Sequence, residues 1–194
     1  MLLLASQSPR RKTLLAQLGV QFTTLNVDID ETHRPLERSE DYVTRLAREK
    51  AQAGLASRPE MQWSLGADTV VVTDQGEHEQ ILGKPRDFEH AKHMWSQLAK
   101  GPHNVLTAVA IASNSDTIEC VVNTQVWFSA LSERQMQWYW NTGEPQDKAG
   151  GYGIQGLAGQ FVKQIKGSYS AVVGLPLYQT SELIKQAGIS QNEC

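Results

Sequence analysis

The sequence predicts a mixed α/β fold, of the α+β kind with a mixed sheet, in a single domain that spans residues 1–194. Segments with helical spacing of apolar residues alternate with strand-like apolar runs, and no internal repeat interrupts them. Two long β-rich runs are joined by only four residues, "SNSD", which is typical of an antiparallel pair. A chain of 194 residues that is 40% apolar is long enough for one sizeable core.

The chain opens with a short apolar strand over Leu2–Ala5, followed by a helix over Pro9–Leu18. Ser8 carries the hydroxyl of an N-cap, and proline suits the first helical position. Gly19 stands where a left-handed C-cap is common. The first segment is therefore expected to be a strand, a turn and a helix.

Helix and strand patterns alternate through the rest of the chain. In order, we expect a helix from Ser39 to near Gly54, a strand over Trp63–Val72, a hairpin connection over Asp74–Glu79, a short strand over Ile81–Gly83, a helix capped by Asp87, paired strands over residues 104–112 and 117–131, a helix opened by a Ser132–Gln135 capping box, strands over residues 161–169 and 170–174, and a helix from Pro176 to near Gly188. Tight hairpins and helical crossovers occur together, so the sheet is expected to be mixed.

Composition excludes several classes of protein. The formal net charge is −3 and no block of five like charges occurs, which argues against a nucleic-acid groove or an anionic membrane surface as partner. No apolar run approaches the roughly 18 residues of a membrane span, and "MLLLA" lacks the features of a signal peptide. We expect a soluble, cytoplasmic protein. Only Cys120 and Cys194 are present, so no structural disulfide is expected.

Three consecutive cations, Arg10, Arg11 and Lys12, occupy the first turn of the first expected helix. The positive end of the helix dipole favours acidic residues there, so each exposed cation costs roughly 0.3–1 kcal/mol. Free backbone N–H groups and guanidinium groups at a strand–turn–helix junction would suit a phosphate chain. A solvated basic face that only aids solubility is the alternative, and this segment alone does not decide between the two.

Two charged residues interrupt apolar patterns. Asp68 lies within the strand "LGADTVVV", where a carboxylate is costly unless it binds a metal, pairs with a cation or transfers a proton. The alternative is a strand end with Asp68 already in solvent. Lys50 follows Leu46 by four residues and so continues the apolar stripe of its helix. It either points inward or extends over apolar surface to reach water.

Other charged positions give weaker signals. Lys84 lies between a glycine and a proline, a position equally natural for an exposed loop lysine. The segment "DIDETHRP" carries three carboxylates, Glu31 among them, but lacks the glycine and ligand spacing of an EF-hand. His90 and His93 have no further ligands nearby in the sequence, so they are expected to face solvent without binding metal.

An acidic site for a hard divalent cation, several convergent cations and the glycine-rich segment "NTGEPQDKAGGYGIQGLAGQ" together predict phosphate-ester or phosphoanhydride chemistry. Competing motifs are absent. The sequence contains neither GxSxG nor the Walker pattern GxxxxGK[ST], and no GxGxxG leads from a strand into a helix.

Seven segments carry a resemblance to a known family: "LLLASQSPRR", "VDIDET", "RLAREKA", "LGADTVVV", "LGKPRD", "DKAGGYGIQG" and "GSYSAVVGLP". In this order and over essentially the whole length, the chain resembles the Maf family of nucleoside triphosphate pyrophosphatases. The resemblance implies an inosine-triphosphatase-like fold, in which helices flank an elongated mixed sheet and the nucleotide lies in a cleft between two lobes.

The same resemblance implies roles for individual residues. The turn from Ser6 to Arg11 would line the cleft and meet the phosphates, and Asp68 is the usual proposal for the catalytic base. The glycine-rich segment resembles the branch that hydrolyses dTTP and UTP. The implied catalytic residues are Glu31, Lys50, Asp68 and Lys84, and the implied substrate-binding residues are Ser6, Ser8, Arg10, Arg11, Thr69 and Gln155. The Gln155 amide has both a donor and an acceptor, which suits the edge of uracil or thymine.

The implied reaction is attack of water on the α-phosphorus of a nucleoside triphosphate, assisted by Mg²⁺ or Mn²⁺, with release of the monophosphate and pyrophosphate. Glu31 and Asp68 would hold the metal, and the sequence leaves open which of them touches it directly. Modified pyrimidine nucleotides stay open as substrates, and so does the oligomeric state, a homodimer included. The alternative function is a nucleotide-binding regulator of cell division that uses the same cleft with little turnover.

Overall fold

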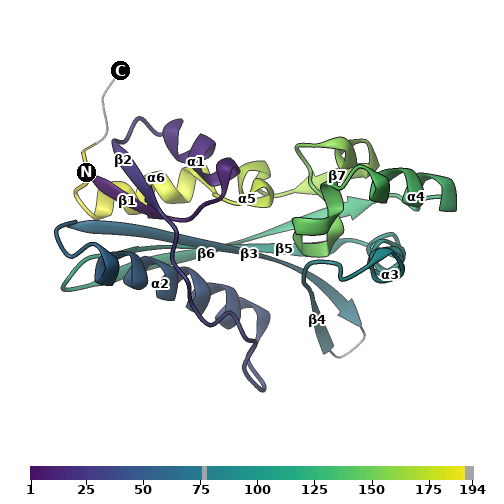
Figure 1. Cartoon of the computed structure of the whole chain (residues 1–194), viewed down its shortest axis with the longest axis horizontal. Helices are drawn as coiled ribbons and strands as arrows, with labels where there is room; N and C mark the ends of the chain where they lie inside the picture. Colours follow the sequence, from purple (N-terminus) through teal and green to yellow (C-terminus); the bar gives the residue numbers. More distant parts are fainter. Residues whose placement is uncertain (76–77, 191–194) are drawn as a thin grey trace. The chain divides into compact units, whose positions relative to one another are not determined.

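The computed structural model describes residues 1–75 and 78–190 of the chain (Figure 1). The strands are β1 (Leu2–Ala5), β2 (Phe22–Leu25), β3 (Trp63–Gln75), β4 (His78–Leu82), β5 (His103–Ala112), β6 (Thr117–Phe128) and β7 (Val162–Lys166). The α-helices are α1 (Pro9–Ala16), α2 (Ser39–Ser57), α3 (Phe88–Leu98), α4 (Glu133–Asn141), α5 (Tyr169–Val173) and α6 (Leu177–Gln186). Three 3₁₀ turns are η1 (Glu144–Asp147), η2 (Ala149–Gly151) and η3 (Leu157–Phe161).

The described strands form one seven-stranded sheet in the order β2-β1-β3-β5-β6-β7, with β4 paired to β3. Strand β1 runs parallel to both β2 and β3, whereas β3–β4 and β6–β7 are antiparallel pairs. The link between β5 and β6 is closed by a hydrogen bond from Ser113 N to Asp116 O (2.8 Å). A connection this short cannot make a parallel crossover. The predicted mixed α/β class is confirmed.

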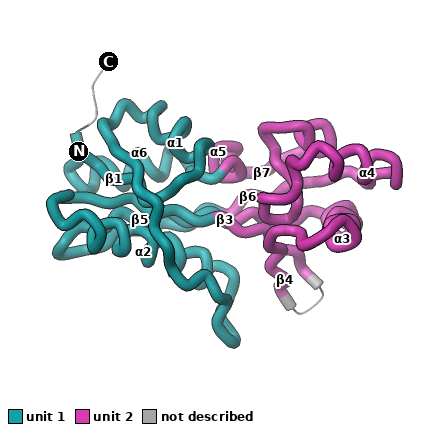
Figure 2. The backbone as a smooth tube through the Cα atoms, in the orientation of Figure 1, with its two compact units in different colours: residues 1–68, 107–122, 174–194 teal, residues 69–106, 123–173 magenta. Residues whose placement is uncertain are grey.

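The chain divides into two compact units (Figure 2). Unit 1 contains residues 1–68, 107–122 and 174–194, and unit 2 contains residues 69–106 and 123–173. Strands β3, β5 and β6 each contribute residues to both units, because the boundaries fall inside them. The organisation of residues 1–194 as a single domain stays a prediction.

In unit 1, helix α2 packs on one face of the strands, and α1 and α6 cover the other (Figure 1). Its core is aliphatic, with fully buried side chains that include Leu2, Leu3, Leu4, Leu15, Leu46, Leu65 and Ile111. The predicted start of α1 is confirmed, since the Ser8 hydroxyl accepts a hydrogen bond from Arg11 N (3.4 Å) and Pro9 is the first helical residue. Gly19 has the left-handed φ of 67° expected of a residue that stops a helix.

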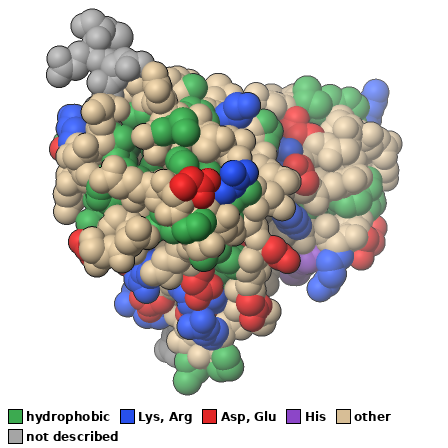
Figure 3. All heavy atoms as spheres, turned by 60° about the vertical axis from the view of Figure 1, so that its left-hand side comes forward, with side chains coloured by type: hydrophobic (Ala, Val, Ile, Leu, Met, Phe, Trp, Pro, Cys, Tyr) green, Lys and Arg blue, Asp and Glu red, His purple; other side chains and the backbone are tan. Residues whose placement is uncertain are grey.

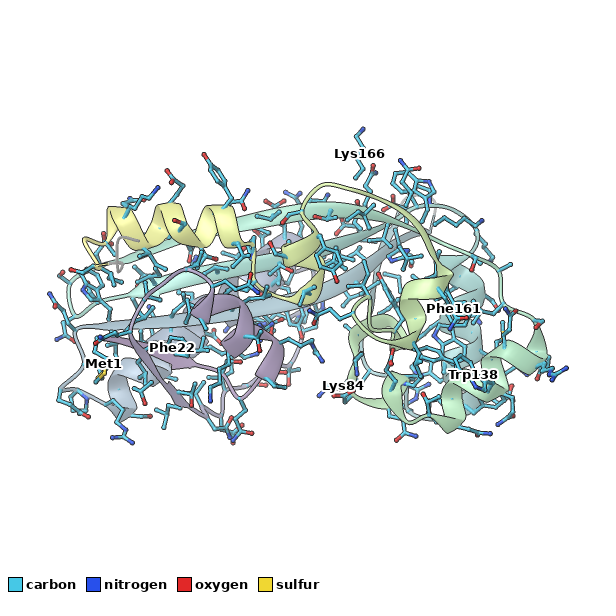
Figure 4. The ribbon with its side chains drawn as sticks, turned by 90° about the horizontal axis from the view of Figure 1, so that it is seen from above. Met1, Phe22, Lys84, Trp138, Phe161 and Lys166 are labelled. Atoms are coloured by element: carbon cyan, nitrogen blue, oxygen red, sulfur yellow. The ribbon has the colours of Figure 1, made fainter. Side chains whose placement is uncertain are left out.

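Unit 2 has an aromatic core. The ring of Tyr139 lies 5.5 Å from Trp95 and 5.7 Å from Phe161, and Phe161 also meets Trp138 at 6.5 Å (Figure 4). At the edge of this cluster, a ring nitrogen of His103 lies 2.8 Å from the Tyr152 hydroxyl. Burial lowers the pKa of His103 to about 4, so its ring is neutral at pH 7.

One predicted strand is wrong. Of the predicted strand "SAVVG" over residues 170–174, the first four residues belong to helix α5 and Gly174 lies in the turn after it, although the paired valines are typical of a strand. The local hydrogen bonds decide the matter, because the Ser168 hydroxyl accepts a bond from Ala171 N (3.2 Å) and opens a helical turn. Gly167, with φ of 131°, turns the chain just before it.

Several predicted boundaries shift. Helix α2 extends to Ser57 instead of fading near Gly54. Within the predicted hairpin connection over Asp74–Glu79, strand β3 reaches Gln75 and β4 begins at His78; residues 76 and 77 lie outside the described residues. Cys120 is a half-buried free thiol, and Cys194 also lies outside them. Within the described ranges, no helix is both long and apolar enough to span a membrane.

Candidate functional site

The candidate centre in unit 1 is one ammonium group shared by two carboxylates. The Nζ atom of Lys50 lies 2.7 Å from Asp68 Oδ1 and 2.7 Å from Glu31 Oε1. The side chains of Lys50 and Asp68 are each 13% exposed, whereas that of Glu31 is 58% exposed. Lys50 therefore points inward, and Asp68 is a buried residue within its strand and not a solvated strand end.

Gly66 explains why the helix that carries Lys50 comes so close to β3. A Cβ atom at this position would lie 2.2 Å from Ala47 O and 2.5 Å from Ala51 N of α2. Only glycine allows the helix backbone to approach the strand to this distance. Because Asp68 follows two residues along the same strand, the Lys50 side chain reaches it directly. A glycine inside an apolar strand is the sequence signal for this close approach, and it is absent from the residues predicted for the site.

Gly66→Ala is therefore expected to lower the free energy of unfolding by about 1–3 kcal/mol, the usual cost of overpacking, because α2 must move away from β3. The measurement is denaturant unfolding. Gly101→Ala is the control, since a Cβ there meets nothing within 4 Å. Equal stability of the two variants would contradict a tight contact at Gly66.

The loop that carries Glu31 is held by two side chains of α2. The Tyr42 hydroxyl donates to Glu31 O (2.8 Å), and Arg45 Nη2 donates to Thr32 O (3.0 Å). Both hydrogen bonds are accepted by main-chain oxygens, so the Glu31 carboxylate stays available to Lys50. No sequence pattern assigns Tyr42 or Arg45 to the site, because both fit the pattern of an ordinary helix.

Arg45 is itself fixed by an ion-pair network. Its guanidinium donates to Glu37 Oε1 (2.6 Å) and Oε2 (2.9 Å), and also to Glu49 (3.3 Å). The hydrogen bonds from Arg45 lower the pKa of Glu37 to about 2. In Figure 3, side chains of both charges crowd the lower part of the face drawn, the end at which Figure 1 draws the loop before α2. This network gives a rigid support for the Glu31 loop.

The turn from Ser6 to Arg11 joins β1 to α1 and also belongs to unit 1. Ser8 N donates to the Ser6 hydroxyl (3.2 Å), and Arg11 Nε donates to Gly174 O (2.9 Å). Burial lowers the pKa of Arg11, while the carboxylates of Asp68 and Glu31 raise it, so this guanidinium lies within the field of the candidate centre.

Its two neighbours differ from Arg11. The Arg10 side chain is half-buried and has no hydrogen-bond or ion-pair partner among residues 1–75 and 78–190, whereas Lys12 is exposed. Arg11 is thus anchored to the protein, and Arg10 is the guanidinium of this turn that can take an external anion.

The other candidate residues lie in unit 2. Thr69 directly follows Asp68 on β3, and Lys84 follows Gly83 in the loop after β4, where its exposed side chain projects from the unit (Figure 4). Gly150 N donates to Gly83 O (3.0 Å), which joins the glycine-rich segment to the residue before Lys84.

The glycine-rich segment also lies directly on β3. Gly150 has φ of 68°, and a Cβ atom there would lie 3.2 Å from the Val71 side chain, two residues along the strand from Thr69. Gln155 is exposed and sits in a turn closed by a hydrogen bond from Gly156 N to Gly153 O (3.0 Å).

The predicted site residues therefore fall into two groups. Unit 1 holds Ser6, Ser8, Arg10, Arg11, Glu31, Lys50 and Asp68, and unit 2 holds Thr69, Lys84 and Gln155. Within unit 1 the structure brings Glu31, Lys50 and Asp68 into direct contact.

The centre offers two carboxylate ligands to a divalent metal. Glu31 and Asp68 offer hard carboxylate oxygens, but the described part of the chain contains no group of three His, Cys, Asp or Glu side chains placed to hold an ion. Mg²⁺ is commonly bound by one or two carboxylates, with ligand phosphates and waters completing its coordination. Two carboxylates fit that arrangement. His90 is engaged elsewhere, since its Nδ1 accepts a bond from Arg86 N (3.2 Å).

Comparison with known proteins gives a consistent result. The family model described as "Maf-like protein" matches residues 1–187. A dTTP/UTP pyrophosphatase of Pseudoalteromonas atlantica is 53% identical over 197 residues, covering 100% of both chains. Proteins with the same name from Pseudoalteromonas translucida and Vibrio parahaemolyticus are 54% identical, over 94% of each chain, and 51% identical, over 95% of this chain and 96% of the relative.

Among solved structures, a nucleoside-triphosphatase / dITP/XTP pyrophosphatase from Mycobacterium abscessus aligns with 66% of this chain and 73% of its own. The TM-score is 0.44 and the sequence identity is 15%. A likeness at this level carries no argument about the site.

Proposed function

Because the chain belongs to the family of Maf-like proteins, we propose that it hydrolyses dTTP and UTP to the nucleoside monophosphate and pyrophosphate. The chain is a hydrolase of phosphoanhydride bonds, and its substrate is a nucleoside triphosphate. The observation that carries the proposal is the buried Lys50–Asp68 pair, with Glu31 at the same ammonium. The names of relatives that share half of its residues support the choice of pyrimidine nucleotides, with modified pyrimidines as further candidates.

In the proposed reaction, Asp68 accepts a proton from the water that attacks the α-phosphorus. Lys50 orients the Asp68 carboxylate through the 2.7 Å contact and adds positive charge to the centre. Arg10 and Lys84 offset the negative charge that develops on the phosphate oxygens. No covalent enzyme intermediate is required, because water is the nucleophile.

Glu31 and Asp68 are the residues that would hold Mg²⁺ or Mn²⁺. When bound, such an ion polarises phosphoryl oxygens and favours ionisation of water. Glu31 is suited to this task because Tyr42 and Arg45 fix its main chain while more than half of its side chain stays exposed. Asp68 would supply a second carboxylate ligand, from the buried side of the same Lys50 ammonium.

The decisive experiment is release of pyrophosphate from a panel of dTTP, UTP, CTP, ATP and GTP in the presence of Mg²⁺ or Mn²⁺. We expect the largest kcat/KM for dTTP and UTP, with one monophosphate formed for each pyrophosphate. Tight nucleotide binding without release of pyrophosphate would contradict the proposed pyrophosphatase activity. It would favour the alternative function, a nucleotide-binding regulator of cell division.

Gln155→Ala is expected to narrow the preference for dTTP over ATP by about tenfold, the scale of losing one or two hydrogen bonds to the base. The amide donates to and accepts from the thymine edge, so the pyrimidine should lose more than the purine. The measurement is kcat/KM for both nucleotides. Gln137→Ala on the exposed face of α4 is the control. An equal loss of kcat/KM for every nucleotide would mean that Gln155 supports the structure of the site and does not recognise the base.

Arg10→Ala is expected to lower kcat/KM for dTTP. The fall should correspond to a loss of about 1.5–3 kcal/mol of transition-state stabilisation, the scale of a charge-assisted hydrogen bond to phosphate. Thermal melting should show an intact fold, slightly stabilised because a cation leaves the positive end of α1. Lys12→Ala, two residues further along the same helix, is the matched control. Comparable losses in the two variants would indicate diffuse electrostatics without a phosphate site at Arg10.

A further inference from the structure

We propose that Glu144 is a positioning residue for substrate selectivity, which acts by holding the turn that carries Gln155. The inference rests on the proposed function, because it assumes that Gln155 reads the pyrimidine base. It adds a residue that lies outside the implied binding set and that acts on Gln155 through the main chain of the residues that follow it.

The Glu144 carboxylate binds the chain just after Gln155. Its Oε2 atom accepts a hydrogen bond from Leu157 N (2.8 Å), and its Oε1 atom accepts one from Ala158 N (3.3 Å). Oε1 also accepts a bond from the Tyr139 hydroxyl (2.7 Å). Three donors thus converge on one carboxylate, and hydrogen bonds to an ionised acceptor are stronger than neutral ones.

Tyr139 binds the main chain on the other side of the turn. Gly153 N donates to the Tyr139 hydroxyl (3.2 Å), and the Tyr139 side chain is fully buried in the aromatic core of unit 2. The residues on both sides of Gln155 are therefore tied to one Tyr139–Glu144 pair, in which Tyr139 is buried and Glu144 is half-buried. Gln155 has no hydrogen-bond partner of its own in the described parts of the chain, so these ties set its position.

The turn lies close against the Glu144 carboxylate and the Lys148 side chain. A Cβ atom at Gly156 would lie 2.2 Å from Glu144 Oε2, and one at Gly153 would lie 2.8 Å from Lys148 Cε. Lys148 Nζ in turn donates to Glu144 O (2.8 Å). A side chain at Gly153 or Gly156 would therefore have to displace the Lys148 stem or the Glu144 carboxylate.

The test compares kcat/KM for dTTP with that for ATP in Glu144→Ala, Gln155→Ala and the double variant. We expect Glu144→Ala to lower the dTTP/ATP ratio by about tenfold, as for Gln155→Ala, because the same hydrogen bonds to the base are lost. In the double variant the ratio should fall no further, because Glu144 acts through Gln155. Glu133→Gln, which alters an exposed carboxylate of unit 2 paired with Lys92, is the control and should keep the wild-type ratio.

Tyr139→Phe keeps the buried ring and removes only the hydroxyl that joins Glu144 to Gly153. Tyr139→Phe tests the proposal even if Glu144→Ala fails to fold. It should also lower the dTTP/ATP ratio of kcat/KM, by a smaller factor than Glu144→Ala. Amide hydrogen exchange at Leu157 and Ala158 gives a second readout, and it should be faster in Glu144→Ala than in the wild type.

Folded Glu144→Ala or Tyr139→Phe with the wild-type ratio would overturn the inference, and so would additive losses in the double variant or unchanged amide exchange. These failures differ from failure of the proposed function. That proposal fails when the wild-type protein itself shows no preference for dTTP and UTP over ATP, whatever Glu144 does.

Discussion

Asp68→Asn is expected to lower the turnover of dTTP by about a hundredfold or more, the scale of losing a positioned base, while the protein stays folded and binds nucleotide. Asparagine keeps the size of the side chain and can still accept a hydrogen bond from Lys50. It cannot take a proton from water. The loss should therefore appear in kcat, measured as pyrophosphate release, and not in nucleotide binding or in the thermal melt.

Asp74→Asn is the matched control, because it makes the same substitution at an exposed carboxylate six residues further along β3. Its turnover should equal that of the wild type. Near-wild-type release of pyrophosphate by Asp68→Asn would remove Asp68 from the role of base. A loss of folding in Asp68→Asn alone would instead indicate that the charge of Asp68 stabilises the Lys50 pair.

Much of the fold could be predicted from local signals. The Ser8 cap with Pro9, the Asp87 cap and the Ser132–Gln135 capping box each placed a helix start where the structure has one. Residues 170–174 could not be assigned correctly, because their composition favours a strand while the hydrogen bond from Ala171 N to the Ser168 hydroxyl favours a helix. At this segment, local hydrogen bonding determines the conformation and residue composition does not.

The candidate centre could be predicted in part, because a charge inside an apolar pattern needs a partner. That argument singled out Lys50 and Asp68 separately, and the structure shows that each is the partner of the other. The contact itself depends on Gly66, at which the backbones of the consecutive elements α2 and β3 come close together. No periodicity within either segment encodes that approach.

The supporting residues could not be predicted at all from their patterns. Tyr42 and Arg45 look like members of an amphipathic helix, and they act on Glu31 only through its main chain and that of Thr32. Glu144 looks like one more polar residue of a glycine-rich loop. Contacts from a side chain to a distant main chain leave no spacing in the sequence, so only the fold reveals them.

Removal of divalent metal is expected to abolish pyrophosphate release, and added Mg²⁺ or Mn²⁺ should restore it. The described residues offer the two carboxylates Glu31 and Asp68, and both already share the Lys50 ammonium. Two carboxylates in that state make a weak metal site until phosphate oxygens complete it. We therefore expect EDTA to leave the thermal melt of the nucleotide-free protein unchanged while it removes activity.

Glu31→Gln locates the metal more finely. Loss of one hard ligand should raise the Mg²⁺ concentration needed for half-maximal activity, and saturating Mg²⁺ should recover part of the rate. Asp28→Asn is the control, because it removes an exposed carboxylate three residues earlier in the same loop and should leave the Mg²⁺ requirement unchanged. An equal shift in the two variants would mean that the loop attracts the ion only by its overall charge, and full activity in EDTA would rule out a metal at Glu31 and Asp68.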